Sequence, residues 1–291
     1  LLLTLDTLQL KAADEPPSSS SHFVTEVDAS CDGNTLVFGV SDDTVQLVDA
    51  ATNVVTTRFK AHADTITCVC CSQQQPNHFL TAGYDNTVKL WDARSPDVAH
   101  TITFPTEVLA ATTLFGDTLL AASQENAIHF VDIRNERKLG IYDDCHTDSV
   151  TRLKRSPAQE GVLASAADDC LVCCYDVSAA QQQDAVLSIM NTECPIARIG
   201  FFGSSYEGIY CLTGVETMSL WHFPSAQRIN TFDNIRNNRA WPLAVEYLVD
   251  CIYSPEDDML RLYAGTHAGQ MVECAVSPSE VRPVKAMPNG H

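Results

Sequence analysis

The chain has 291 residues, of which 45% are hydrophobic and 19% charged, and its formal net charge is −19. So acidic a chain disfavours nucleic acid as a partner, because binding to phosphates depends on Lys and Arg. There is no run of 18 apolar residues, so we expect no membrane-spanning helix and no membrane partner. The 12 cysteines lie mostly in strand patterns, which predicts free thiols and a cytoplasmic or nuclear location.

The chain begins with Leu1 to Leu10, a loosely alternating segment that is too short for a transmembrane helix and lacks the basic region of a secretory signal. It is interpreted as one strand. Residues 11–21 follow as a polar linker that contains PPSSSS. From His22 onward, short β-prone runs alternate with turn residues. In the first repeat of this pattern the predicted strands are Val24–Ala29, Thr35–Gly39, Thr44–Asp49 and Val54–Phe59.

The second repeat contains the clearest unit of the pattern, TAGYDNTVKLWDAR at residues 81–94. Two β-prone runs, Phe79–Ala82 and Thr87–Trp91, flank the turn residues Gly83-Tyr84-Asp85-Asn86. This stretch therefore predicts a β-hairpin.

Comparable hairpins recur roughly every 40 to 45 residues. Aligned on Trp91-Asp92, their ends are mostly an apolar or aromatic residue before an acidic one: Val48-Asp49, Val131-Asp132, Tyr175-Asp176, Trp221-His222 and a degraded copy, Cys274-Ala275. This period with a Trp-Asp ending resembles the WD-repeat family of β-propellers, in which each repeat forms one four-stranded blade. The resemblance covers nearly the whole chain and implies an all-β fold in a single domain, residues 1–291.

Six complete repeats are recognisable, and Asn289-Gly290-His291 resembles the start of a further WD repeat. We therefore expect seven blades in the full protein. Leu1 to Leu10 would complete the last blade, so that no sheet edge there is left exposed. A propeller of six blades is the alternative.

WD blades often contain a hydrogen-bonded set of His, Ser or Thr, Asp and Trp. The resemblance implies one set in the second repeat (His62, Thr81, Asp85, Trp91) and one in the fourth, with Tyr in place of Trp (His146, Ser165, Asp169, Tyr175). A Ser–His–Asp set also raises the hypothesis of a hydrolase. Because the set repeats with the blades and the chain lacks a G-x-S-x-G motif, we interpret it as structural and expect no catalytic residue and no enzyme activity.

Three cysteines of the fourth repeat, Cys170, Cys173 and Cys174, raise the alternative of a metal site. A zinc site usually needs a second pair of ligands at matched spacing. We therefore expect neither a metal ion nor another cofactor.

Two short motifs share the pattern Asp-x-Arg, namely Trp91-Asp92-Ala93-Arg94 and Val131-Asp132-Ile133-Arg134. They resemble the box by which WD proteins dock on the damaged-DNA-binding adaptor of cullin-based ubiquitin ligases. The resemblance implies docking through Asp92, Arg94 and Arg134. The alternative is that each arginine pairs with a neighbouring carboxylate.

Residues 233–243, DNIRNNRAWPL, form the longest stretch outside the repeats. Arg236, Arg239 and Trp241 are of the types that dominate binding hot spots, so this segment is a second candidate for protein binding. Alternatively, Trp241 packs on the sixth repeat and the arginines pair with local carboxylates.

The expected function is that of a non-enzymatic scaffold that presents its loops to other proteins. We expect the protein to be a monomer. The alternative function is that of a substrate receptor of a cullin-type ubiquitin ligase, with the ligase adaptor as a partner.

Overall fold

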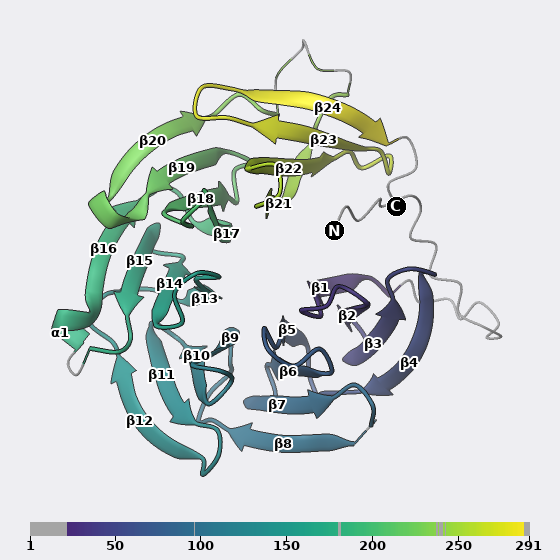
Figure 1. Cartoon of the computed structure of the whole chain (residues 1–291), viewed down its shortest axis with the longest axis vertical. Helices are drawn as coiled ribbons and strands as arrows, with labels where there is room; N and C mark the ends of the chain where they lie inside the picture. Colours follow the sequence, from purple (N-terminus) through teal and green to yellow (C-terminus); the bar gives the residue numbers. More distant parts are fainter. Residues whose placement is uncertain are drawn as a thin grey trace. The chain divides into compact units, whose positions relative to one another are not determined.

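The computed structural model describes residues 22–95, 97–179, 182–236, 238, 241 and 243–287. The described strands form six antiparallel sheets of four strands each, which we call blades one to six in chain order. Within a blade, strands that are consecutive in the chain pair with each other (Figure 1). No described helix is long and apolar enough to cross a membrane.

The described chain forms two compact units, and the first of them ends at Asp144 and contains blades one to three. Its strands are β1 (Val24–Ala29), β2 (Thr35–Val40), β3 (Thr44–Asp49), β4 (Val54–Lys60), β5 (Ile66–Cys71), β6 (His78–Gly83), β7 (Thr87–Asp92), β8 (Val98–Thr103), β9 (Ala110–Leu114), β10 (Leu119–Gln124), β11 (Ala127–Asp132) and β12 (Arg137–Tyr142).

The second unit begins at Cys145 and contains blades four to six. Its elements are β13 (Val150–Arg155), β14 (Val162–Ala167), β15 (Leu171–Asp176), α1 (Gln182–Ala185), β16 (Val186–Asn191), β17 (Ile196–Phe202), β18 (Gly208–Thr213), β19 (Met218–His222), the 3-10 helix η1 (Phe223–Ser225), β20 (Gln227–Phe232), β21 (Tyr247–Ser254), β22 (Met259–Gly265), β23 (Met271–Val276) and β24 (Val281–Met287).

The strands predicted for the first repeat agree with β1 to β4 within one residue at each end. In the hairpin of blade two, Asn86 takes the left-handed conformation, with φ of 64°. Asn adopts this conformation more readily than most residues, which explains the turn. The strand predicted at Leu1 to Leu10, the linker at 11–21 and the repeat start at 289–291 lie outside the described residues, which form six blades.

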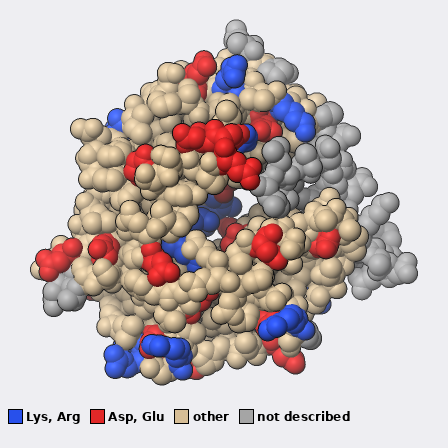
Figure 2. All heavy atoms as spheres, in the orientation of Figure 1, with Lys and Arg blue, Asp and Glu red and all other residues tan. Residues whose placement is uncertain are grey.

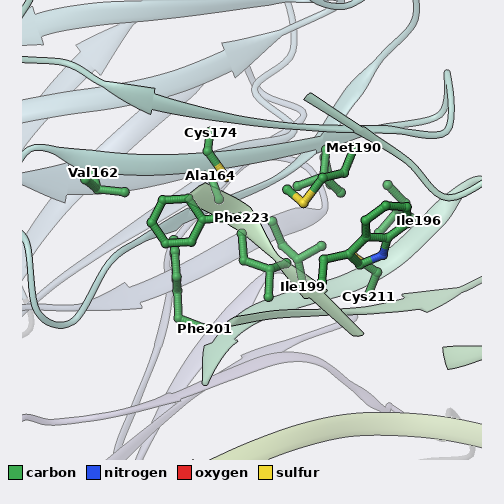
Figure 3. Close-up of a cluster of buried hydrophobic side chains, with 13 residues drawn as sticks. Val162, Ala164, Cys174, Met190, Ile196, Ile199, Phe201, Cys211 and Phe223 are labelled. Atoms are coloured by element: carbon green, nitrogen blue, oxygen red, sulfur yellow. The ribbon is translucent and has the colours of Figure 1, made fainter. Parts of the chain in front are cut away.

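Neighbouring blades within a unit bury their faces against each other. In the first unit, Trp91 and Phe79 of blade two pack with Val45 and Leu47 of blade one. In the second unit, Figure 3 shows the equivalent cluster, in which residues of blade four meet residues of blade five: Cys174, Met190, Ile199, Cys211 and Phe223. A blade alone would leave these faces in water, so this packing is what stabilises the repeats.

The fourth strand of every blade contains a β-bulge, where one residue has no partner on the third strand. The bulged residues are Thr56, Ala99, Leu139, Leu187, Ile229 and Val284. In blades three to six this residue is aliphatic and exposed. A bulge bends its strand and redirects the side chain, so these aliphatic groups point into solvent instead of the core.

Candidate functional site

Four side chains of blade two form one chain of hydrogen bonds. The indole Nε1 of Trp91 donates to Oγ1 of Thr81 over 2.9 Å, and this oxygen lies 2.7 Å from Nε2 of His62. His62 Nδ1 lies 2.9 Å from Oδ1 of Asp85, which belongs to the turn between β6 and β7. The structure thus brings together the four residues that the sequence predicted for this repeat.

The two ends of this chain of hydrogen bonds, Trp91 and Asp85, determine where its protons lie. An indole N–H only donates, and an ionised carboxylate only accepts. His62 therefore donates from Nδ1 and accepts the hydroxyl proton of Thr81 at Nε2. Burial lowers the pKa of His62, which keeps the ring neutral. Burial acts to raise the pKa of Asp85, but hydrogen bonds from Thr87, the backbone of Ala63 and His62 outweigh it and lower that pKa to about 2.

Two residues that sequence reasoning missed hold the carboxylate of Asp85 in place. The hydroxyl of Thr87 donates to Oδ1 of Asp85 over 2.6 Å. Lys89 Nζ donates to the carbonyl oxygen of Ala61 over 2.6 Å and lies 4.0 Å from Oδ2 of Asp85. Both residues follow the turn on β7, so the Asp-x-Thr-x-Lys spacing was the available sequence signal.

The sequence pattern predicts Gly83 in the turn of this hairpin, whereas the structure places it in a strand. It ends β6, and the left-handed turn residue is Asn86. A Cβ atom at Gly83 would lie 2.9 Å from Nδ1 of His62 and 3.0 Å from the carbonyl oxygen of Thr65. The glycine is therefore required for the close approach of the His62 ring to the strand.

Blade four contains the second predicted set. His146 Nε2 lies 2.6 Å from Oγ of Ser165, and Nδ1 lies 3.1 Å from Oδ2 of Asp169. The hydroxyl of Tyr175 lies 3.4 Å from the same Ser165 Oγ. Burial lowers the pKa of His146 and raises that of Tyr175 far above its ordinary value.

The only serine of these sets is inaccessible to a substrate. Ser165 has no exposed surface, and its hydroxyl is within hydrogen-bond distance of both His146 and Tyr175. A nucleophile must reach a substrate atom, and here the surrounding strands occupy that space. The burial and the repetition of the set both favour a structural role.

Cys173 and Cys174 of blade four are buried free thiols, whereas Cys170 is partly exposed. Burial raises the pKa of Cys173 and raises that of Cys174 to about 12. Such thiols stay protonated, whereas a metal binds the thiolate. In the described part of the chain no group of three or more His, Cys, Asp or Glu side chains could hold a metal ion.

The arginines of both Asp-x-Arg motifs fold back onto their own aspartates. Arg94 donates to Asp92 from Nε and Nη2 over 2.9 and 2.6 Å, and Arg134 donates to Asp132 over 3.1 and 3.0 Å. Hydrogen bonds from the two guanidinium groups hold the pKa of each carboxyl below its ordinary value. The side chains of Arg94 and Arg134 nevertheless remain 68% and 72% exposed.

The aspartate of this motif has a structural task that does not need the arginine. Asp176 of blade four accepts the N–H and the hydroxyl of Ser178, and Asp49 of blade one accepts the same two groups of Thr52. The aspartate thus caps the turn after the third strand in blades with and without arginine. The arginine adds an ordered, exposed positive charge in blades two and three.

The segment at 233–243 is partly built into blades five and six. Trp241 is half-buried and packs on a core that includes Leu220, Ile235 and Val245. Arg236 is exposed, and Arg239 lies outside the described residues. The placement of Trp241 fits the packing alternative for this residue and leaves Arg236 at the surface.

The comparisons with known proteins agree with this geometry. The family model described as "WD domain, G-beta repeat" matches residues 53–92, which include His62, Thr81, Asp85 and Trp91. A chain of the crystal structure of the mitotic checkpoint complex matches with a TM-score of 0.67 at 16% identity, over 84% of this chain and 72% of that chain, which shows the fold. These findings show a β-propeller of the WD-repeat type, and the chain is similar to WD-repeat proteins.

Two curated relatives extend this similarity over most of the chain. The WD repeat-containing protein 89 homolog of Dictyostelium discoideum is 27% identical over 268 residues, which are 91% of this chain and 74% of the relative. The WD repeat-containing protein GTS1 of Arabidopsis thaliana is 27% identical over 259 residues, which are 86% of this chain and 66% of that protein.

Proposed function

We propose that this protein is a non-enzymatic scaffold that binds other proteins through the turns and loops of its blades. The observation that carries the proposal is the contrast between its two kinds of polar site. The His–Asp sets are buried and satisfied within blades two and four. The guanidinium groups of Arg94 and Arg134 are ordered but exposed.

The two exposed arginines belong to neighbouring blades of one unit. Nε2 of His100, on β8 of blade two, lies 3.2 Å from the carbonyl oxygen of Ile133, which precedes Arg134 in blade three. An arginine held by a carboxylate loses little entropy when it binds, because its side chain is already ordered. This arrangement favours a partner that offers acidic groups or carbonyl oxygens to both arginines.

The test is a comparison of partners captured in cells. Proximity labelling with wild type and with Arg94→Ala/Arg134→Ala should yield different protein lists, while both forms melt alike. Arg58→Ala is the matched control, because Arg58 is also an exposed arginine paired with an aspartate, Asp42. Identical lists for wild type and the double variant would remove these arginines from the binding surface.

A more specific role is that of a substrate receptor of a cullin-type ubiquitin ligase, with Asp92, Arg94 and Arg134 as the docking residues. The two adjacent Asp-x-Arg motifs support it, although their aspartates also cap turns. Co-precipitation of the damaged-DNA-binding adaptor should be lost in Arg94→Ala/Arg134→Ala and kept in Arg58→Ala. Undiminished adaptor binding by the folded double variant would exclude this role and leave the scaffold proposal in place.

Residues 233–243 form a second proposed binding surface, which uses Arg236, Arg239 and Trp241. Because Trp241 packs on the core, the arginines are substituted first, as Arg236→Ala/Arg239→Ala. Loss of a partner from this variant with an unchanged melting temperature supports the proposal. Trp241→Ala separates the two roles of the tryptophan, since a packing role lowers the melting temperature.

A further inference from the structure

The outer strand of blade three, β12, is unusually exposed. It is the edge strand of its sheet, paired with β11 on one side only. Among the fourth strands of the six described blades, only β12 has five consecutive exposed residues, Arg137 to Ile141. Such an edge offers backbone N–H and C=O groups to another strand.

The side chains of β12 form an ordered sequence of charge and apolar surface. Arg137 and Lys138 begin the strand, and Figure 2 shows basic side chains at the margin where Figure 1 draws β12. Leu139 and Ile141 in the middle are each 48% exposed. The exposed carboxylates of Asp143 and Asp144 follow directly.

This order is self-complementary when the strand is reversed. In an antiparallel pair centred on Gly140, Arg137 of one copy lies opposite Asp143 of the other, and Leu139 lies opposite Ile141. Each contact occurs twice, as the twofold symmetry of a homodimer requires. A Cβ atom built on Gly140 would meet nothing within 4 Å, so a side chain introduced at this position has open space around it.

We propose that β12 pairs with the β12 of a second copy of this chain, antiparallel about Gly140. Backbone hydrogen bonds would join the strands, the aliphatic pairs would leave water, and the two Arg137–Asp143 pairs would select the register. Such a dimer differs from the monomer that we expected from the sequence. One six-residue strand pair is smaller than a standard interface, so we expect a weak dimer, with Kd on the order of 10 μM or above.

The alternative is that Arg137 and Lys138 only protect the edge from pairing, as charged residues often do on edge strands. Charge reversal distinguishes the two. Sedimentation velocity from about 1 to 200 μM should show concentration-dependent dimer for wild type. Arg137→Asp alone, and Asp143→Arg alone, should each lower the association constant about tenfold or more, because two like-charge pairs then meet.

Mixing the two single charge variants gives the decisive test. An equal mixture of Arg137→Asp and Asp143→Arg should form heterodimer about as well as wild type, because both cross-strand pairs are restored in it. Arg282→Asp, on the edge strand β24, is the matched control and should dimerise like wild type. A wild type that stays monomeric throughout, or a dimer that both reversals leave unchanged, overturns the proposal.

A covalent probe reports the register directly. Opposed Cα atoms of antiparallel strands are about 4.5–5.5 Å apart, within the range of a disulfide. Mild oxidation of Gly140→Cys should therefore link two copies through position 140, identified by peptide mass spectrometry among the native cysteines. Ala99→Cys, at an exposed bulge of β8, should not cross-link above background. Equal linkage at both positions would contradict pairing through β12.

Discussion

Blades two and four contain equivalent four-residue networks of histidine, aspartate, a hydroxyl residue and an aromatic residue, and they differ most at the aromatic end. In blade two the indole of Trp91 only donates, so the hydrogen bonds run in one direction from Trp91 to Asp85. In blade four the hydroxyl of Tyr175 both donates and accepts, and it lies 3.4 Å from Ser165 instead of 2.9 Å. The longer distance means that Tyr175 holds its neighbour less tightly than Trp91 does.

The strand beside the histidine differs as well. Blade two has Gly83 where blade four has Ala167. Gly83 pairs with Ile66, the first residue of β5, and Ala167 pairs with Val150, the first residue of β13. The histidine–aspartate distance is 2.9 Å in blade two and 3.1 Å in blade four. The missing methyl group therefore accompanies the shorter of the two histidine–aspartate contacts.

Removing the aromatic end of the blade-two network should produce the largest effect. Trp91→Ala deletes a buried ring that packs on Phe59 and Phe79 and also removes the donor to Thr81. We expect a loss of about 3–5 kcal/mol in the free energy of unfolding, as for other large-to-small core changes. Urea denaturation of wild type and variant measures it. A loss below about 1 kcal/mol would contradict the packing described for Trp91.

The repeat pattern predicted the parts of this comparison that depend on local sequence. Strands of alternating residues and the His–Asp pairs recur with the blades, so they were accessible without a structure. The role of Gly83 was not, because it depends on how close the ring of His62 lies to β6 in space. Leu139 was missed for a similar reason, since a bulge is a property of two paired strands and not of one sequence segment.

Exchanging the small residues beside the histidines sharpens the comparison. Gly83→Ala would place a methyl group against His62 and the backbone of Thr65, and we expect it to destabilise the protein by about 1–3 kcal/mol. Ala167→Gly is the reciprocal variant. It should cost only about 1 kcal/mol, mainly through backbone entropy. Equal melting temperatures for Gly83→Ala and wild type would show that the close approach of His62 is not required.

The pH dependence of stability tests the neutral histidines in both blades. The pKa values of His62 and His146 are lowered in the folded state, so below about pH 6.5 the unfolded chain takes up protons that the folded chain does not. Stability should therefore fall as the pH decreases from about 7 to 5. It should fall again below about pH 4, because Asp85 has a folded pKa of about 2.

Urea midpoints between about pH 7.5 and 3 measure this profile. His62→Gln/His146→Gln is the control: it should be less stable at neutral pH but show a shallower decline between about pH 7 and 5. A wild-type midpoint that stays constant over that interval would mean that the two rings are not held neutral by burial.

The smallest effect should come from removing the aromatic hydrogen bond of blade four while keeping its ring. Tyr175→Phe removes a hydroxyl that lies 3.4 Å from Ser165 and also interacts with Cys145 and Cys173, while Ser165 keeps His146 as a partner, so we expect a loss of about 0.5–1.5 kcal/mol. Trp91→Phe is the counterpart in blade two. It also shrinks a buried ring, and it removes the only indole donor to Thr81, so its loss should be clearly larger. Urea denaturation measures both losses. Equal losses for the two variants would mean that the indole donor of Trp91 stabilises blade two no more than the hydroxyl of Tyr175 stabilises blade four.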